Sequence, residues 1–247
     1  MTIRPIDIPV PGARKAILYI HGILGTPDHF RDFFPQVSDC SQYSLLLDGH
    51  GGNAGDFAKT SMAIWKKQVH DKVVELLGTY ESFLIVAHSM GTLFAISEAL
   101  LFPDRVKGIF LLASPLKLSV KPKLAVNCWK VFRGNISAED VQALAAQQAY
   151  GISRDMHVFR YLGWIPRYLE LFREIRRVRG EVQGLRVPVI AFQSEQDEMV
   201  SRKAADILKE IPGARVHVLE NSTHFYYDPS DLQRMLREFL VFIKDIS

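Results

Sequence analysis

The chain has 247 residues, of which 48% are hydrophobic and 23% are charged, and this composition is close to that of soluble globular proteins. It excludes intrinsic disorder, collagen-like repeats and coiled coils. The longest apolar runs, such as residues 83–87, are far shorter than the ~20 residues that cross a bilayer. The formal net charge of +3 is too small to indicate a class of partner. We therefore predict a folded protein without a transmembrane helix.

Short apolar runs alternate with longer amphipathic stretches along the chain, which is the pattern of βα units around a parallel sheet. The runs are apolar at nearly every position, as expected where helices cover both faces of a sheet. We predict six strands, over residues 16–20, 43–47, 83–87, 106–112, 189–192 and 216–219.

The helices between these strands are indicated by apolar residues at spacings of three and four. Residues 61–77 have this pattern, formed by Met62, Trp65, Val69, Val73 and Leu76. Residues 92–101 and 232–243 are predicted helices as well. Thr26-Pro27-Asp28 predicts a further helix start, because threonine is a suitable N-cap and proline suits the first helical position.

The alternation stops between residues 115 and 186, where no strand-like run occurs and helix formers, aromatic residues and arginine are frequent. We predict that this stretch is a helical insertion between two strands of a core formed by residues 1–114 and 187–247. Residues 117–186 hold 13 Lys and Arg but 6 Asp and Glu, so the excess positive charge of the chain is concentrated in the insertion.

One motif points to a nucleophile. Residues 87–91 are Ala-His-Ser-Met-Gly, directly after a predicted strand and directly before a predicted helix. This is the G-x-S-x-G pattern of a nucleophile elbow, with alanine in the first small position. The residues two before and two after the serine must be small, because the sharp turn brings them into close contact. Ser89 is therefore a candidate nucleophile in a strained backbone conformation.

With this motif the chain resembles the α/β-hydrolase family over nearly its whole length, which implies a mostly parallel sheet with helices on both faces. Residues 21–25, His-Gly-Ile-Leu-Gly, are similar to the family's H-G-x-x-G loop. The resemblance implies that the backbone N–H groups of Ile23 and Met90 form an oxyanion hole. It also implies that the insertion is a lid over the active site, and we name residues 115–186 the cap segment.

A serine nucleophile needs a base, and the base needs a carboxylate that orients it. In this family the acid and then the base follow the serine along the chain. Asp197 follows a predicted strand in a segment similar to the family's D-x-x-V pattern, and His224 follows the last predicted strand. The resemblance thus implies that Ser89, Asp197 and His224 form a triad. Glu195 and Glu198 are alternative acids.

Further histidines lie near these motifs. His50, between two glycines, resembles a family loop beside the active site and is expected to contribute to the substrate pocket, with an ordinary glycine-rich turn as the alternative. His88 is expected to point away from the nucleophile, and His21 to brace its loop. No metal is predicted, because no His, Cys and Asp cluster has zinc-site spacing. No cofactor is predicted, because no nucleotide-binding glycine motif occurs.

The cap segment contributes candidate substrate-binding residues. Its aromatic residues could line a pocket for an acyl chain, although most are expected to pack within the cap: Trp129, Phe132, Tyr150, Phe159, Tyr161 and Trp164. The two tryptophans are our candidates. Residues 167–178 form a basic amphipathic pattern, for which solvated arginines are favoured over contact with an anionic membrane surface. Nucleic-acid binding is not expected, because no recognised binding module accompanies the basic residues.

Together these features predict a serine hydrolase that cleaves small carboxylic esters of short or medium acyl chains, similar to bacterial carboxylesterases and monoacylglycerol lipases. An acyl thioesterase is the alternative that the basic cap segment favours. Carbon–carbon hydrolases and haloperoxidases share the triad, and a non-catalytic ligand-binding member is least favoured. Residues 1–9 lack the apolar core of a secretory signal, so we predict a cytoplasmic protein in which Cys40 and Cys128 are reduced and buried. No oligomeric state is predicted.

Overall fold

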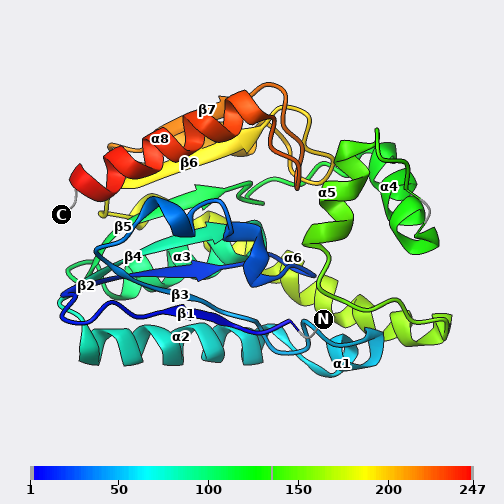
Figure 1. The fold of residues 1–247 in the computed structure, drawn as a ribbon, viewed down its shortest axis with the longest axis horizontal. Helices are drawn as coiled ribbons and strands as arrows, with labels where there is room; N and C mark the ends of the chain where they lie inside the picture. The colour runs from blue at the N-terminus through cyan, green and yellow to red at the C-terminus, as the bar shows by residue number, and fades with distance from the viewer. Residues whose placement is uncertain (1–2, 135, 246–247) are drawn as a thin grey trace.

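The computed structural model describes residues 3–134 and 136–245. Within these residues the centre is a seven-stranded sheet in the order β1-β3-β2-β4-β5-β6-β7 (Figure 1). All neighbouring strands are parallel except β1, which pairs antiparallel with β3 at one edge. The strands are β1 (Ile6–Ile8), β2 (Lys15–Ile20), β3 (Ser41–Ser44), β4 (Ser82–His88), β5 (Val106–Leu112), β6 (Val189–Ser194) and β7 (Arg215–Leu219).

Helices cover both faces of the sheet, which confirms the predicted fold class (Figure 1). One face carries α2 (Met62–Thr79), α3 (Met90–Leu101) and part of α6 (Ile165–Glu181). The other carries α8 (Pro229–Asp245) and the short 3-10 helices η1 (Pro27–Phe30) and η2 (Phe34–Gln36).

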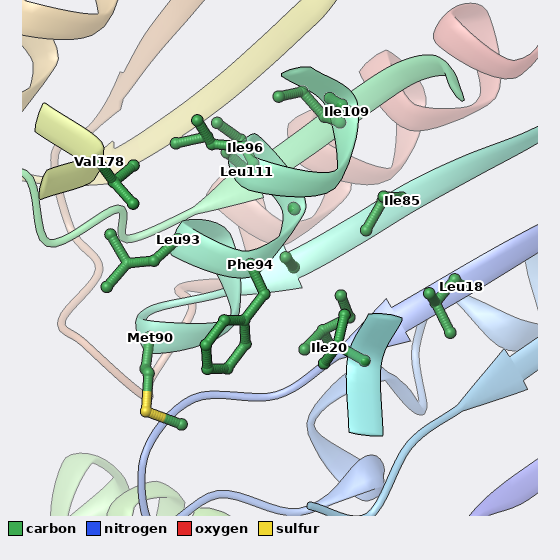
Figure 2. Close-up of a cluster of buried hydrophobic side chains, with 14 of the residues drawn as sticks. Leu18, Ile20, Ile85, Met90, Leu93, Phe94, Ile96, Ile109, Leu111 and Val178 are labelled. Atoms are coloured by element: carbon green, nitrogen blue, oxygen red, sulfur yellow. The ribbon is translucent and has the colours of Figure 1, made fainter. Parts of the chain in front are cut away.

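Each central strand therefore contributes side chains to two separate cores. Leu18 and Ile20 of β2 enter the core beneath α2 and α3, whereas Ile17 and Tyr19 enter the core beneath α8. Figure 2 shows the first core, where strand side chains lie against those of α3 and α6: Leu18, Ile20, Ile85, Leu93, Phe94, Ile96 and Val178. Burying one such side chain contributes about 1.5–3 kcal/mol, so the two clusters fix the ends of the strands on which the site is built.

Several elements differ from the sequence-based prediction. β3 spans Ser41–Ser44 instead of residues 43–47, because its place is set by hydrogen bonds of polar side chains. Gln42 accepts a hydrogen bond from the Tyr19 hydroxyl (2.7 Å), and its amide donates to two backbone carbonyls. The helix predicted after Thr26 is only the 3-10 helix η1, and the Thr26 side chain makes no capping bond. Edge strand β1 and two six-residue helices, α1 (Ala54–Lys59) and α7 (Ala204–Lys209), were too short for a periodic signal.

The cap segment joins β5 to β6 and is helical where the structure describes it. Its further elements are α4 (Pro122–Arg133), α5 (Val141–Ala149), η3 (Val158–Trp164) and η4 (Val182–Gly184). Figure 1 shows α4 and α5 at one end of the molecule, beyond the sheet, while α6 runs back along α3. Within the described residues no helix is long and apolar enough to cross a membrane.

The two ends of the cap segment are attached differently. The Glu170 carboxylate of α6 accepts the Met62 N–H at the start of α2 (2.9 Å), and Arg177 donates to the Ser97 hydroxyl of α3 (2.7 Å). Leu171, Ile175 and Val178 of α6 are buried as well. In α4, by contrast, Asn127 is the only buried residue of the helix as the structure describes it. Helix α6 thus anchors the cap segment firmly. Helix α4 itself is attached lightly, although residues 117–121 before it share three backbone hydrogen bonds with residues 198–201.

Candidate active site

The chain turns sharply at Ser89, between β4 and α3. Ser89 has φ of +50°, a conformation that L residues rarely adopt, and its N–H donates to the Leu112 carbonyl (2.8 Å). The turn leaves no room for a side chain at the two glycines that pack against it, Gly22 and Gly91. A side chain at Gly91 would overlap the Ile20 carbonyl oxygen, and one at Gly22 would place its Cβ 2.8 Å from the Ser89 Cβ. These contacts are the physical reason for the small residue two positions after the serine and for the glycine in the loop that follows β2.

His224 lies between Ser89 and Asp197. Its Nε2 is 3.1 Å from the Ser89 Oγ, and its Nδ1 is 2.7 Å from the Asp197 Oδ2. A carboxylate accepts hydrogen bonds, so Nδ1 carries the proton and Nε2 is free to accept one from the serine hydroxyl. Ser89 is 6% exposed and the other two side chains 1%, so the three residues form one shielded chain of hydrogen bonds.

The electrostatic environment of the His224 ring favours a basic imidazole. Burial alone would lower the pKa of His224, but the negative charge of Asp197 and its hydrogen bond, together with the charge of Glu198, raise the pKa above its ordinary value of 6.5. Asp197 is itself held in place, because its Oδ1 accepts the backbone N–H groups of Met199 (2.7 Å) and Val200 (2.8 Å). These two bonds hold the Asp197 carboxylate against the backbone of the residues that follow it.

The two alternative acids have different contacts. Glu195 is at the surface and pairs with Arg202 (3.1 Å). Glu198 is 2% exposed, and its carboxylate accepts the backbone N–H of His224 (3.2 Å) instead of its ring. The other oxygen of Glu198 lies 3.4 Å from the Asn127 amide nitrogen of α4. Sequence reasoning missed this position of Glu198, because the contact joins segments far apart in the chain.

The remaining histidines support the loops around Ser89. His21 accepts the Leu47 N–H through Nε2 (3.1 Å), and His50 accepts the Leu24 N–H through Nε2 (3.0 Å). Burial lowers the pKa of both rings, that of His50 to about 4, so they serve as neutral hydrogen-bonding braces. The His88 ring packs against the ring of His29, and its Nε2 donates to the His224 carbonyl (3.0 Å).

Two backbone amides stand near the serine. Ile23 is in the loop after β2, and Met90 is the first residue of α3. The N–H groups of the first helical turn have no partner within their own helix, so that of Met90 is available. For the N–H of Ile23 no hydrogen-bond partner occurs among residues 3–134 and 136–245. Both residues are buried, and Ile23 lines the cavity described next.

A cavity of about 700 Å³ opens in front of Ser89, beneath the cap segment. Its walls are mostly apolar and come from α4, α5, α6 and the loops that follow β2 and β6; among its lining residues are Phe132, Tyr150, Tyr161, Trp164, Tyr168, Leu171 and Phe172. Its polar or charged lining residues other than Ser89 include Asn127, Gln147, Arg154 and Glu198. Such a cavity is suited to an apolar chain with a few polar anchors.

The structure corrects several of the expected positions. Trp129 does not line this cavity; it is 55% exposed and stacks with Arg133 (4.2 Å). His50 does not line it either, since its ring braces Leu24 from behind. Cys128 is exposed and lines the cavity, whereas Cys40 is buried as expected. Trp129 and Cys128 both lie on the twelve-residue helix α4, and the sequence did not indicate which face of this helix meets the cavity.

Comparisons with known proteins agree with this architecture. A model of the alpha/beta hydrolase family matches residues 17–238. The chain belongs to this family.

In the part of the chain that the structure describes, no group of three or more His, Cys, Asp or Glu residues could hold a metal ion.

Solved structures of the same fold include three that the chain covers almost completely. A metagenome-derived lipolytic enzyme has 20% identity and a TM-score of 0.75, with 98% of both chains covered. The monoacylglycerol lipase of Paleococcus ferrophilus has 18% identity and a TM-score of 0.69, with both chains covered fully. Est816, an N-acyl homoserine lactone degrading enzyme, has 20% identity and a TM-score of 0.66, with 96% of both covered. No protein of curated function matches the chain. Identities this low establish the shared fold and leave the substrate open.

Proposed function

We propose that this hydrolase is a serine esterase that cleaves carboxylic esters of apolar acyl chains. The observation that carries the proposal is the buried chain of hydrogen bonds from Ser89 through His224 to Asp197, which ends at an apolar cavity. A serine, an imidazole and a carboxylate in this order perform nucleophilic catalysis on acyl groups. The cap segment, residues 115–186, acts as the lid that supplies most of the acyl-binding wall.

The reaction begins when the Ser89 Oγ attacks the ester carbonyl and its proton passes to the His224 Nε2. The carbonyl oxygen then carries a negative charge, which the N–H groups of Ile23 and Met90 stabilise; one such donor is typically worth about 3–4 kcal/mol of barrier. The C–O bond to the alcohol breaks, and the imidazolium gives its proton to the departing oxygen. Asp197 keeps Nδ1 protonated and offsets the positive charge of the ring.

A second half-reaction releases the acid. Water attacks the acyl group on Ser89, His224 takes the water proton, and the serine leaves with a proton from the imidazolium. The overall change is ester and water to carboxylic acid and alcohol. The apolar cavity favours the acyl chain, because each methylene buried there contributes about 0.8 kcal/mol.

The proposal is tested by labelling with a fluorophosphonate and by turnover of a panel of p-nitrophenyl esters and acyl thioesters. Wild type and Ser38→Ala, a change at an exposed serine that does not line the cavity, should be labelled and active. Ser89→Ala should lose both properties while its circular dichroism spectrum stays unchanged. A folded Ser89→Ala protein with wild-type turnover would contradict the assignment, and faster turnover of thioesters than of esters would assign the thioesterase reaction instead.

A further inference from the structure

The cap segment has an unusually apolar surface. Of the 18 large hydrophobic residues that are exposed among the described residues, 13 lie between residues 115 and 186. They include Phe159 (81% exposed), Leu162 (60%) and Trp129 (55%). Scattered single hydrophobic residues are normal on a surface, but a concentration of this kind marks an interaction site.

These residues gather at the end of the molecule where the cavity lies. Val126, Trp129 and Phe132 are on α4, and Phe159, Leu162 and Ile165 are on η3 and the start of α6. Figure 1 shows α4 and the chain that leads into α6 beyond the sheet, on the same side of the molecule. We call these six residues the apolar rim.

The apolar rim is continuous with the cavity in front of Ser89. Phe132 belongs to both, since it is 36% exposed and lines the cavity. Leu118, Val120 and Phe172 are likewise both exposed and part of the cavity wall. An acyl chain that enters the cavity from this side therefore stays in contact with apolar side chains along its path.

Positive charges accompany the apolar rim. The guanidinium of Arg133 lies over the Trp129 ring (4.2 Å), and that of Arg154 lies over the Phe132 ring (4.7 Å). Both arginines are exposed, and neither has an ion-pair partner among the described residues. Aromatic side chains that carry stacked arginines match the boundary of a lipid layer, where the rings meet acyl chains and the cations meet anionic head groups.

From these observations we propose that the apolar rim docks on the surface of an anionic lipid aggregate, so that an acyl chain passes from the lipid into the cavity. The occupant is lipid and not a second copy of the chain, because a symmetric dimer through this face would bring its arginines together. The inference deepens the proposed function and rests on it for the ester that is cleaved.

Binding is measured by flotation with phosphatidylcholine vesicles, with and without phosphatidylglycerol, using the full chain with Ser89→Ala so that hydrolysis does not alter the lipid. We expect binding that rises with phosphatidylglycerol and falls with salt. Phe159→Ser with Leu162→Ser should weaken it at least about a hundredfold, because two large apolar side chains no longer insert. Arg133→Gln with Arg154→Gln should weaken it roughly thirtyfold on the anionic vesicles alone.

The matched control is Val74→Ser with Leu101→Ser, two exposed hydrophobic residues on core helices α2 and α3. This pair should bind vesicles like the parent. In the background with Ser89 intact, the apolar rim variant should keep its turnover of a dissolved p-nitrophenyl ester and lose turnover of a vesicle-embedded long-chain ester. None of its changed residues lines the cavity.

Three results would overturn the docking proposal. The first is no binding to either vesicle, and the second is an equal loss in the control pair. The third is a protein in place of lipid on the apolar rim, seen either as a dimer in sedimentation velocity that the apolar rim variant breaks or as saturable binding of an acidic acyl-carrier protein. Failure of the esterase proposal is distinguishable, because it would leave vesicle binding intact and remove labelling of Ser89.

Discussion

The loops at the carboxyl ends of β4, β6 and β7 differ from the cap segment above them in how their residues are held. Ser89, Asp197 and His224 are nearly fully buried and bonded to one another. Each is also held by a bond that involves a backbone N–H: that of Ser89 to the Leu112 carbonyl, those of two residues after Asp197 to its carboxylate, and that of His224 to Glu198. Helix α4 buries only Asn127 among its described residues and presents Val126 and Trp129 to solvent. In the proposed reaction, the sheet positions the reacting groups and the cap segment provides an apolar wall.

The largest effect should follow from a change at the sheet end. Asp197→Asn removes the charge that orients His224 and stabilises its protonated form, so kcat should fall about ten-thousandfold with little change in folding. Glu195→Gln, which alters a surface ion pair with Arg202, is the matched control and should stay near wild type. A larger loss in Glu195→Gln than in Asp197→Asn would show that the acid had been assigned to the wrong residue.

The strained turn should be sensitive to a single methyl group. Gly91→Ala would place a Cβ against the Ile20 carbonyl oxygen, and the expected cost is more than about 3 kcal/mol of unfolding free energy in urea. Gly180→Ala is the control in the cap segment, since its Cβ would meet nothing within 4 Å. That variant should be unchanged or gain up to about 1 kcal/mol, as alanine favours helix. Equal stability of the two variants would contradict the close packing at the turn.

The cap wall should set preference for chain length without affecting the chemistry. Tyr168→Ala removes part of the cavity wall, so the ratio of kcat/KM between successive acyl-chain lengths should change by up to about fourfold per methylene. Labelling by a small fluorophosphonate should be retained. Trp129→Ala, on the outer side of α4, should leave the ratio for dissolved esters unchanged. If Trp129→Ala shifted the ratio as much as Tyr168→Ala, the cavity would not be the acyl site.

The smallest effect concerns pH. His224 must be unprotonated to accept the serine proton, so kcat/KM should fall as the pH drops through its pKa, which lies above 6.5. Glu198→Gln removes one of the negative charges that raise this pKa, so the acidic limb should move to lower pH. Glu195→Gln should leave the limb in place. A limb that moves to higher pH in Glu198→Gln would contradict the electrostatic role of this carboxylate.

Much of the fold could be predicted from the sequence, because buried strands are continuous apolar runs and helices on the sheet have apolar residues at spacings of three and four. The six parallel strands and helices α2, α3 and α8 were expected from apolar runs and from spacings of three and four. Strand β3 lies earlier than predicted, and its buried polar residue Gln42 is hydrogen-bonded to Tyr19 and to a backbone carbonyl. The elbow at Ser89 was expected from its motif, since a turn this tight requires small neighbours within five residues.

The sequence by itself thus determined what depends on neighbours along the chain: the alternation of strands and helices, the turn at Ser89 and the concentration of positive charge between residues 117 and 186. Only the tertiary structure decided what depends on contacts across the chain. It placed Glu198 against the His224 backbone, turned Trp129 to solvent and Tyr168 to the cavity, and made His50 a brace behind Leu24. The physical reason is that helical periodicity identifies an apolar face, while the element that this face meets is chosen by packing between residues distant in sequence.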